Sequence, residues 1–459
     1  MFCQTDRILP DSRIRYNNTI KKSKEEKKVK KGLAMLVILC TVAGTLAGCQ
    51  AKETGGTKEA AKTEAESKGT GDEEVVTLFH HIGEEAARET LENLINAFEE
   101  ANPGIKIEEQ GIDFSQYDTM LKTKLAGGDA PDLIMGRPKM YADLIRAGHI
   151  EPLTGSDFLD NVAGVTLESM KVDGEIYAVP TNQGGMGIFY NKKVFEDHKI
   201  EIPKTHEALL EAAQKLQDAG ITPFAHGFQE SWMAQCEIQS DLYGYTLETN
   251  PTMFKDIVDG KKKFADYPEF KECAERTADR LAFEGGDDFG TDASKARNML
   301  INGEAAMLVS GNWEISEFVN AGVDDQIGFF ATPNTDDDQP VLGLAPDGCY
   351  MITSQSEHID AAKKFIGFLT TKEGAAILNA AGYDIPCSTE VDTAALSPIV
   401  LDFIDIQENG KVYNYESEDI FSGQFDATFR KWQEEFAADT ERDVDAMIEQ
   451  LDAEIAAIQ

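Results

Sequence analysis

Tryptophan is rare in this chain, and its three copies differ in what surrounds them. Trp313 follows a glycine turn, Gly311-Asn312, at the end of an apolar run, where an indole ring projects easily. An aromatic plate beside planar forked groups suits a ligand with C–H faces and many hydroxyls. Trp313 could instead pack in the core. Trp432 lies in an amphipathic C-terminal run and is predicted to pack.

Histidine and cysteine are the other residue types that could carry chemistry. His80 and His81 follow the first apolar run, and one of the two should point away because side chains alternate along a strand. No third metal ligand accompanies them. The seven cysteines show no CxxC spacing and no Cys/His cluster. We therefore expect no metal site.

The first folded stretch alternates strand and helix patterns. Predicted strands are 75–79, 105–107 and 132–135, and predicted helices are 87–98, 114–126 and a run ending near Ala147. This alternation predicts a parallel α/β sheet. Ligands of such sheets lie at the carboxyl ends of the strands. That rule directs attention to His80, His81, Gly136 and Arg137.

The segment from Asp173 to Pro223 organises the rest of the chain. Asp173-Gly174 predicts a hairpin turn, residues 176–179 a strand ended by Pro180, and residues 188–190 a second short strand. The glycine-rich run 183–187 lies between the two strands and is expected to bend easily. We expect the chain to cross from one lobe to another there, which makes Gln183 a candidate ligand contact.

Further elements are predicted beyond the crossing. Residues 209–216 read as a helix, 305–309 and 327–330 as strands, 349–352 as a strand on the return to the first lobe, and 361–369 as a helix. Another helix starts at Thr371. The last stretch, 421–459, is predicted to be helical, with an apolar stripe that packs on the core. Asp347, in the return, and Tyr383 and Asp384, before Pro386, are candidate contacts or solvated loop residues.

Composition limits the class of protein. A chain of 459 residues exceeds one ordinary core and predicts two lobes. The net charge of −39 argues against nucleic acid as a partner and predicts a solvated acidic surface. Four cysteines fall in the folded part and are expected to be small buried hydrophobes, with a disulfide frame as the alternative: Cys236, Cys273, Cys349 and Cys387.

The N-terminus has the pattern of a secretory signal. Residues 1–31 hold ten Lys or Arg against four Asp or Glu, and an apolar run from Leu33 to Leu46 follows, too short to span a bilayer comfortably. Leu46-Ala47-Gly48-Cys49 resembles the bacterial lipobox, which implies lipid attachment at Cys49; an ordinary cleavage site is the alternative. The basic segment ahead of the apolar run is long for a signal peptide. We therefore also hypothesise that translation starts at Val29 from a GTG codon, which the nucleotide sequence tests.

Cleavage before Cys49 removes ten positive and four negative charges and moves the net charge from −39 to −45. Residues 50–74 contain no aromatic residue and only the small and polar types Ala, Lys, Glu, Thr, Gly, Ser, Asp and Gln ahead of Val75. Such a segment cannot bury a core and predicts a flexible tether that holds the folded part near the membrane.

Several motifs together resemble the family 1 extracellular solute-binding proteins, which include the maltose-binding proteins. They are Gly174-x-x-Tyr-Ala-Val-Pro180, Phe189-Tyr-Asn-Lys192, Ile202-Pro-Lys-Thr205 and Asn302-Gly-Glu-Ala-Ala-Met through Gly311-Asn-Trp313. Matching motifs run from about residue 75 to about 390. One departure is His206, where the family usually has a Trp that mainly packs.

The resemblance implies an α/β, two-lobed periplasmic-binding-protein-like fold of type II, with lobes joined by a multi-crossing hinge. We expect a signal peptide over 1–48, a lipidated Cys49 and tether over 49–74, an N-terminal lobe of 75–185 plus 346–390, and a C-terminal lobe of 186–345 plus 391–459. It also implies that Trp313 stacks on a sugar ring and that Glu230 and Trp232 face the cleft. Gly136 replaces a stacking aromatic, so the ligand is not expected to be recognised as maltose is. Arg137 follows it and could bind hydroxyls or an acidic group, or be a solvated loop residue. The resemblance implies no cofactor and no catalytic residues.

The resemblance further implies a lipid-anchored receptor on the outer face of the bacterial cytoplasmic membrane. Its partners would be a sugar or oligosaccharide and the permease subunits of an ABC importer, and we expect a monomer. Two alternatives stay open. A secreted carbohydrate-active enzyme would need two carboxylates at a set separation, which sequence alone does not reveal. A receptor that feeds a sensor kinase would differ in its neighbouring genes.

Overall fold

The computed structural model describes residues 73–82, 85–112, 114–283, 285–335, 337–415 and 423–459. The predicted signal peptide, Cys49 and the tether up to residue 72 lie outside these ranges. No helix among the described residues combines the length and the apolar character needed to cross a membrane.

The first sheet has the strand order β11-β3-β1-β2. Its strands are β1 (Glu74–His80), β2 (Ile105–Gly111), β3 (Leu133–Met135) and β11 (Tyr350–Ile352). The first three run parallel, and β11 pairs antiparallel with β3. The parallel α/β arrangement predicted from residues 75–135 is confirmed, and the edge strand comes from far along the chain.

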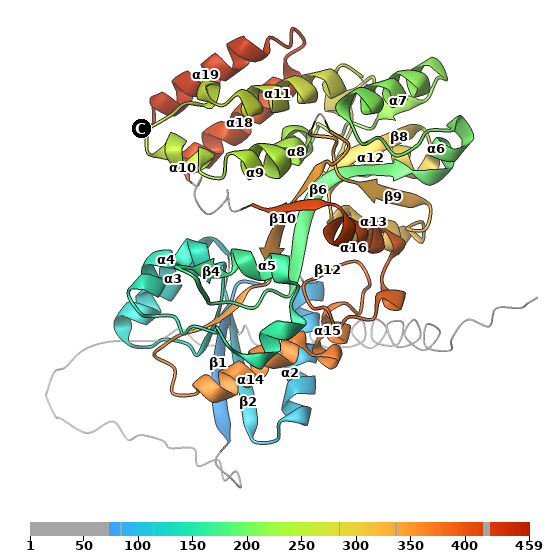
Figure 1. Cartoon of the computed structure of the whole chain (residues 1–459). Helices are drawn as coiled ribbons and strands as arrows, with labels where there is room; N and C mark the ends of the chain where they lie inside the picture. The colour runs from blue at the N-terminus through green and yellow to red at the C-terminus, as the bar shows by residue number, and fades with distance from the viewer. Residues whose placement is uncertain (1–72, 83–84, 113, 284, 336, 416–422) are drawn as a thin grey trace, which may run out of the picture. The chain divides into compact units, whose positions relative to one another are not determined.

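Helices cover this sheet because each has one apolar stripe to bury. The helices of this part are α2 (Glu85–Ala101), α3 (Phe114–Gly127), α4 (Ala142–Arg146), α5 (Gly164–Ser169), α14 (Ile359–Thr370) and α15 (Lys372–Leu378). Leu91, Leu94 and Phe98 of α2 are buried as predicted. Phe98 contacts Phe365 of α14 edge to face at 5.2 Å, so α2 and α14 lie side by side (Figure 1).

The second sheet has the order β13-β10-β6-β8-β7, with β9 and β12 also paired to β6. Its strands are β6 (Asn182–Asn191), β7 (Thr222–Phe224), β8 (Ala305–Gly311), β9 (Ile327–Phe330), β10 (Val341–Asp347), β12 (Ile385–Pro386) and β13 (Lys411–Asn414). The first half of β6 pairs with β10 and β12, and its second half with β8 and β9. This strand therefore joins two sets of partners.

The glycine run 183–187 does not lie between two strands as predicted, because the whole run belongs to β6, which curves along its length in Figure 1. The glycines there also permit close packing. A Cβ at Gly185 would lie 2.9 Å from the Gly343 carbonyl oxygen, and one at Gly187 would lie 2.5 Å from the Phe329 ring. Absence of a side chain lets neighbouring strands and rings approach the backbone.

The predicted hairpin is confirmed. Strands β4 (Lys171–Val172) and β5 (Glu175–Ile176) pair antiparallel around Asp173 and Gly174. Asp173 has φ 51° and Gly174 φ 92°, as a two-residue turn of this hand requires. The strand predicted for residues 176–179 is shorter than expected, since after β5 only Val179 forms a bridge, to Tyr350.

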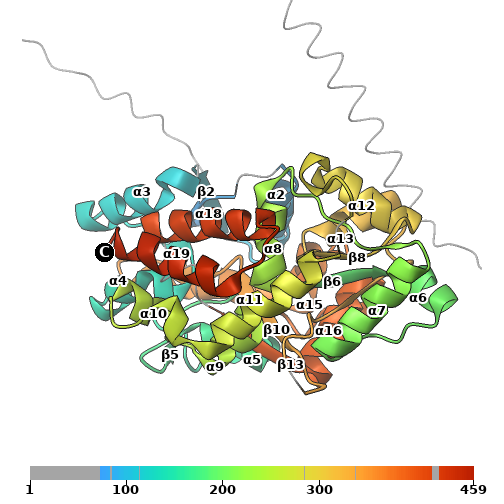
Figure 2. The same cartoon turned by 90° about the horizontal axis from the view of Figure 1, so that it is seen from above.

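The C-terminal stretch consists of two helices, α18 (Gln424–Ala438) and α19 (Val444–Ala456); residues 421 and 422 lie outside the described residues. Both pack with α11 (Pro268–Leu281), and the three lie together in Figure 2. Ile448, Leu451 and Ile455 are buried, which confirms the predicted core stripe. Trp432 is fully buried and donates its indole N–H to the Met447 carbonyl at 2.7 Å.

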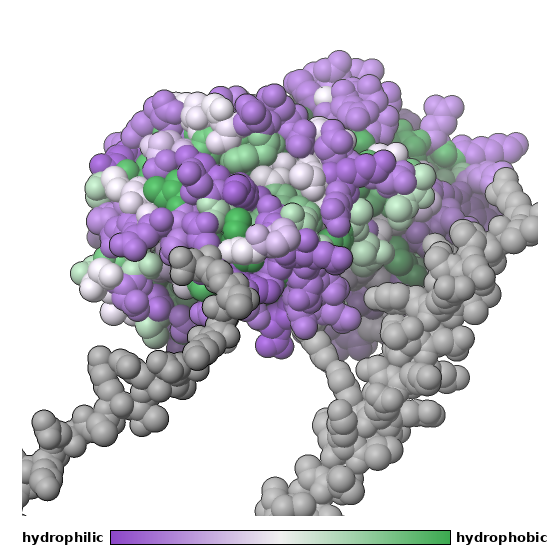
Figure 3. All heavy atoms as spheres, turned by 90° about the horizontal axis from the view of Figure 1, so that it is seen from below, coloured by the Kyte–Doolittle hydropathy of each residue, from purple (hydrophilic) through white to green (hydrophobic). Residues whose placement is uncertain are grey.

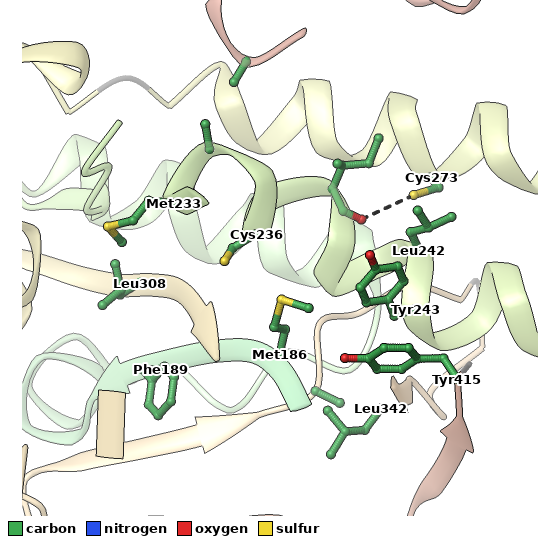
Figure 4. Close-up of a cluster of buried hydrophobic side chains, with 14 of the residues drawn as sticks. Met186, Phe189, Met233, Cys236, Leu242, Tyr243, Cys273, Leu308, Leu342 and Tyr415 are labelled. Atoms are coloured by element: carbon green, nitrogen blue, oxygen red, sulfur yellow. Dashed lines mark hydrogen bonds between the residues drawn. The ribbon is translucent and has the colours of Figure 1, made fainter. Parts of the chain in front are cut away.

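The larger core lies under the second sheet (Figure 4). There Tyr243 stacks on Tyr415 with ring centroids 4.3 Å apart, and Met186 and Cys236 fill the space beside them. All four described cysteines are free and buried, as predicted. Burial raises the pKa of the Cys236 and Cys273 thiols, so they behave as small hydrophobes.

The remaining helices surround this second core. They are α6 (Lys192–His198), α7 (His206–Asp218), α8 (Ser231–Asp241), α9 (Leu247–Thr249), α10 (Met253–Val258), α12 (Ala293–Asn302), α13 (Glu314–Ala321) and α16 (Pro398–Asn409). On the face drawn in Figure 3, hydrophilic residues predominate and hydrophobic ones are scattered among them. This surface fits the acidic composition.

Candidate functional site

A pocket of about 670 Å³ lies at the carboxyl ends of β1 and β3. Its apolar wall includes Leu91 and Leu94 of α2 and Met135 at the end of β3. Its polar side chains are His81, Thr90, Thr181, Asn182, Asp347, Tyr350, Asn379, Tyr383 and Asp384. We call it the carboxylate pocket, after Asp347 and Asp384. A pocket at this edge is where ligands of parallel α/β sheets bind.

The two adjacent histidines differ in orientation. His80 is buried, accepts the Ile82 backbone N–H at Nδ1 over 3.1 Å, and contacts Glu109 through Nε2 at 2.7 Å. Because Nδ1 is an acceptor, the proton lies on Nε2 and is donated to Glu109. His81 lines the pocket and contacts the Tyr117 ring edge to face at 4.9 Å. Strand alternation thus separates a histidine engaged within the fold from one that faces the pocket.

The two carboxylates come from different elements. Asp347 ends β10 and accepts the Gly348 backbone N–H at 2.8 Å, while Asp384 precedes β12. Burial and the neighbouring charge of Asp347 raise the pKa of Asp384 to about 6. Burial, together with Asp384, also raises the pKa of Tyr383. Three residues predicted from the sequence, Asp347, Tyr383 and Asp384, therefore line the same pocket as His81.

Five polar residues of the pocket were missed in the sequence: Thr90, Thr181, Asn182, Tyr350 and Asn379. Thr181 and Asn182 flank the crossing that singled out Gln183, so their polar side chains beside the glycine run were an available signal. Asn379 follows α15 and is buried. Nothing in its local sequence distinguishes it from other helix-terminal asparagines.

A second group of predicted residues comes together elsewhere in the second core region. Trp232, in the first turn of α8, and Trp313, before α13, contact each other edge to face with centroids 5.9 Å apart. Glu230 accepts the Trp232 indole N–H at 2.8 Å and the Ala293 backbone N–H at 3.3 Å. Trp313 is 45% exposed. This aromatic pair (Trp232 and Trp313) leaves one indole face open to solvent.

Gly311 is what allows Trp313 to take this position. A Cβ at Gly311 would lie 2.2 Å from the Trp313 ring, so the indole lies directly over the glycine backbone. Asn312 Oδ1 accepts the Gly185 backbone N–H at 3.1 Å, which fastens the turn to β6. The Gly-Asn-Trp sequence thus presents a ring and anchors it to the long strand.

Two other predicted residues do not line the carboxylate pocket. Gln183 is buried and donates to Gln407 Oε1 at 2.9 Å, as part of the packing around β6. Arg137 is half-buried ahead of a short helical turn, Pro138–Tyr141. The Tyr141 ring lies against Gly136, where a Cβ would come within 2.3 Å of it.

Within the described part of the chain, no group of three or more His, Cys, Asp or Glu side chains could hold a metal ion. The site is thus built of aromatic rings, hydroxyls, amides and carboxylates. Such a set binds and orients a polar solute by hydrogen bonds and stacking.

The arrangement is that of a solute-binding fold, as solved structures illustrate. RafE of Streptococcus pneumoniae in its apo form matches with a TM-score of 0.69 at 19% identity, over 85% of this chain and 99% of that one. A sugar transporter of Bacillus licheniformis in complex with stachyose matches with a TM-score of 0.60 at 20% identity, over 84% and 100%. The predicted α/β two-lobed fold of type II is confirmed.

Residues 83–376 match the family described as bacterial extracellular solute-binding protein, and the chain belongs to this family. A relative, the multiple sugar-binding protein of Streptococcus mutans, is 25% identical over 315 residues, which are 65% of this chain and 72% of the relative. The resemblance seen in the motifs is therefore confirmed at the level of the family.

Proposed function

We propose that this protein is an extracytoplasmic receptor that binds a carbohydrate, an oligosaccharide in particular, and delivers it to the permease of an ABC importer. The observation that carries the proposal is the carboxylate pocket, in which His81, Asn182, Asp347 and Asp384 surround an apolar wall. Saccharides need this mixture of hydrogen-bonding groups and apolar surface. The names of the relatives, a multiple sugar-binding protein and a stachyose-bound transporter, support a saccharide ligand.

The aromatic pair is proposed as a second contact surface for the same ligand. Its exposed indole, Trp313, can stack on a sugar ring, while Glu230 holds Trp232 in place. A ligand that contacts both the carboxylate pocket and the aromatic pair would favour the conformation in which the two lie closest. The reason is that a ligand shifts a conformational equilibrium by its differential affinity for the two conformations. Domain boundaries at about residues 185 and 346 remain part of this proposal.

Lipid attachment at Cys49 and delivery at the outer face of the cytoplasmic membrane complete the proposal. The lipobox-like sequence before Cys49 supports the anchor. Metabolic labelling with a fatty acid analogue tests it: we expect labelled full-length chain in the membrane fraction, and neither label nor membrane retention for Cys49→Ala. Labelling that survives in Cys49→Ala would contradict the anchor.

Tryptophan fluorescence tests the receptor function. The mature chain from residue 50 is titrated with raffinose, stachyose, galactotriose and tri-N-acetylchitotriose. We expect a saturable change with at least one of them, with the change reduced in Trp313→Ala and retained in Trp432→Phe, whose ring is buried in the core. If no member of a full panel of neutral mono- and oligosaccharides changes the fluorescence, a carbohydrate ligand is contradicted. Turnover of a bound glycan would favour an enzyme.

A further inference from the structure

The carboxylate pocket holds hydrogen-bond acceptors that the described residues leave unsatisfied, beside donors such as the Asn182 amide and the Tyr383 hydroxyl. Asn379 is 5% exposed, and its Nδ2 donates to the Ala375 carbonyl at 2.9 Å. That bond fixes the amide orientation, because the flipped amide would set oxygen against oxygen. Its Oδ1 is buried and has no hydrogen-bond partner among the described residues. Because an unpaired buried acceptor is costly, a donor group of a ligand that reached this oxygen would be favoured.

The two carboxylates extend this acceptor surface. Within the described ranges, the Asp384 side chain takes part in no hydrogen bond or ion pair with the protein. Asp347 accepts one backbone N–H, from Gly348, at 2.8 Å, which leaves lone pairs on both of its oxygens. A carboxylate accepts and never donates while it is ionised. Hydroxyl and ammonium groups of a ligand satisfy such oxygens.

The charge of the pocket has one sign. The described residues that line it include Asp347 and Asp384 and no Lys or Arg. The shift of Asp384 arises from burial and from Asp347, and no cation offsets it. An anionic group in this pocket would meet two like charges without a partner, and like-charge juxtaposition opposes binding strongly.

We infer that the carboxylate pocket selects saccharides that are neutral or carry an amine, and that Asp347, Asp384 and Asn379 exclude sugars that bear a carboxylate or a phosphate. This inference rests on the proposed carbohydrate receptor function and specifies its substrate class. It assigns the discrimination to three acceptors that converge from β10, the segment before β12 and the end of α15. Aromatic stacking by Trp313 would not discriminate in this way, since it responds to the sugar face and not to its charge.

Matched saccharide pairs test the inference by isothermal titration calorimetry of the mature chain at pH 7.5. Galactotriose is compared with trigalacturonate, cellotriose with its uronate counterpart, and tri-N-acetylchitotriose with the cationic chitotriose. We expect each neutral trisaccharide that binds to bind at least ~100-fold more tightly than its uronate partner. Chitotriose should bind at least as well as its acetylated form wherever that form binds.

Substitutions show which carboxylates are responsible for the discrimination against uronates. Asp384→Asn and Asp347→Asn should each strengthen binding of the uronate itself about tenfold, since an amide removes one like charge, and so narrow the gap in affinity between a neutral trisaccharide and its uronate. Asp360→Asn, at an exposed position in the first turn of α14, is the matched control and should leave the gap unchanged. Thermal unfolding of each variant verifies that it is folded. If Asp384→Asn does not fold, the Asp347→Asn variant, at an exposed position, carries the test.

The outcomes separate the inference from the function on which it rests. Binding of either uronate as tightly as its neutral partner, or an unchanged gap in both Asp→Asn variants, overturns the inference and leaves the receptor function standing. If no neutral or amino saccharide binds, the carbohydrate receptor function is contradicted, and the inference that rests on it is contradicted too. Binding of at least one neutral saccharide without binding of either uronate supports both the receptor function and the inference.

Discussion

Two groups of acidic residues in this protein have the same side-chain chemistry and different surroundings. In the second core, Asp241 and Glu237 of α8 are buried with Arg280 of α11, whose Nη1 lies 2.5 Å from Asp241 Oδ2 and whose Nε lies 3.5 Å from Glu237 Oε2. His226 lies 3.8 Å from Glu237. Arg276, also of α11 and buried, lies with its Nε 3.9 Å from Asp241 Oδ1. We call Asp241, Glu237, Arg276 and Arg280 the buried ion network. In the carboxylate pocket, Asp347 and Asp384 have no cation beside them among the described lining residues.

The pKa shifts of the two groups follow from this difference. Burial raises the pKa of Glu237, although the charges of His226 and Arg280 oppose the rise. Burial works to lower the pKa of Arg280, but Asp241 and Glu237 outweigh it and the net shift is upward. In the pocket, burial and Asp347 both raise the pKa of Asp384. The network balances its own charges, whereas the pocket leaves its charges for a ligand to satisfy.

This comparison teaches that a carboxylate's role depends on whether the fold also supplies its partner. Breaking a balanced buried network costs stability, because an uncompensated charge stays in the core. Changing an unbalanced carboxylate at a pocket affects ligand binding more than folding. The predictions below test this distinction, beginning with the largest effect.

Arg280→Met should lower the free energy of unfolding by about 3–5 kcal/mol, because two buried carboxylates lose the guanidinium that contacts both and only Arg276 remains beside Asp241. Urea denaturation monitored by circular dichroism measures the change. The control is Arg146→Met, which removes an exposed pair with Asp173 whose side chains are 56% and 64% exposed. It should leave the denaturation midpoint almost unchanged. An equal loss of stability in Arg280→Met and Arg146→Met would contradict the distinction between a buried ion network and an exposed ion pair.

Asp384→Asn should weaken binding of a neutral saccharide about tenfold, since a hydrogen bond to an ionised acceptor is stronger than one to an amide oxygen. Calorimetric titration at pH 7.5 gives the dissociation constant. Arg280→Met should keep the affinity of its folded fraction close to that of the wild type, because the network does not line the pocket. An unchanged affinity in Asp384→Asn would mean that this carboxylate does not contact the ligand.

Saccharide affinity should fall about fivefold between pH 7.5 and pH 5. With a pKa of about 6, Asp384 is mostly protonated at pH 5, and the neutral acid resembles the Asn variant as an acceptor. The other titratable side chains that face it from the pocket are Asp347, His81, Tyr350 and Tyr383. Asp384→Asn should flatten the profile, and His81→Gln should retain it. A fall that persists in Asp384→Asn and disappears in His81→Gln assigns the titration to His81.

The smallest effect concerns stability without ligand. The folded-state pKa of Asp384 is raised above its ordinary value of 3.8, so the folded state binds more protons between about pH 4 and 6. The contribution of this carboxyl to stability therefore falls as pH rises through that window. Asp384→Asn should be more stable than the wild type at pH 7.5 by up to about 1 kcal/mol, after allowance for solvent screening, and equal to it near pH 4. A loss of stability at pH 7.5 would indicate a structural role for Asp384.

Much of the fold was accessible from the sequence because the signals are local. Apolar spacing identified β1, α2, β2, α3 and β3, and the Asp173-Gly174 pair fixed a hairpin whose φ values only a few residue types adopt. The C-terminal stripe and Trp432 were predicted to pack, and they do. Short-range backbone sterics and the helical and strand periods determine these features without knowledge of distant neighbours.

The candidate site was only partly accessible. The rule for strand ends led to His81, the return segment led to Asp347, and the position before Pro386 led to Asp384. The sequence did not distinguish His81 from His80, which Glu109 on the neighbouring strand holds. It misread the glycine run 183–187, whose form depends on pairing with β8 and β10, strands more than a hundred residues away.

What the sequence by itself determined was the family, the α/β class and the set of residues able to bind a polar solute. Only the tertiary structure decided which acceptors stay free. Asn379 became a candidate because its amide nitrogen is engaged and its oxygen is not, and Asp384 because Asp347 and no cation lies beside it. Hydrogen-bond satisfaction and charge balance are properties of neighbours in space, and the chain brings those neighbours together only when it folds.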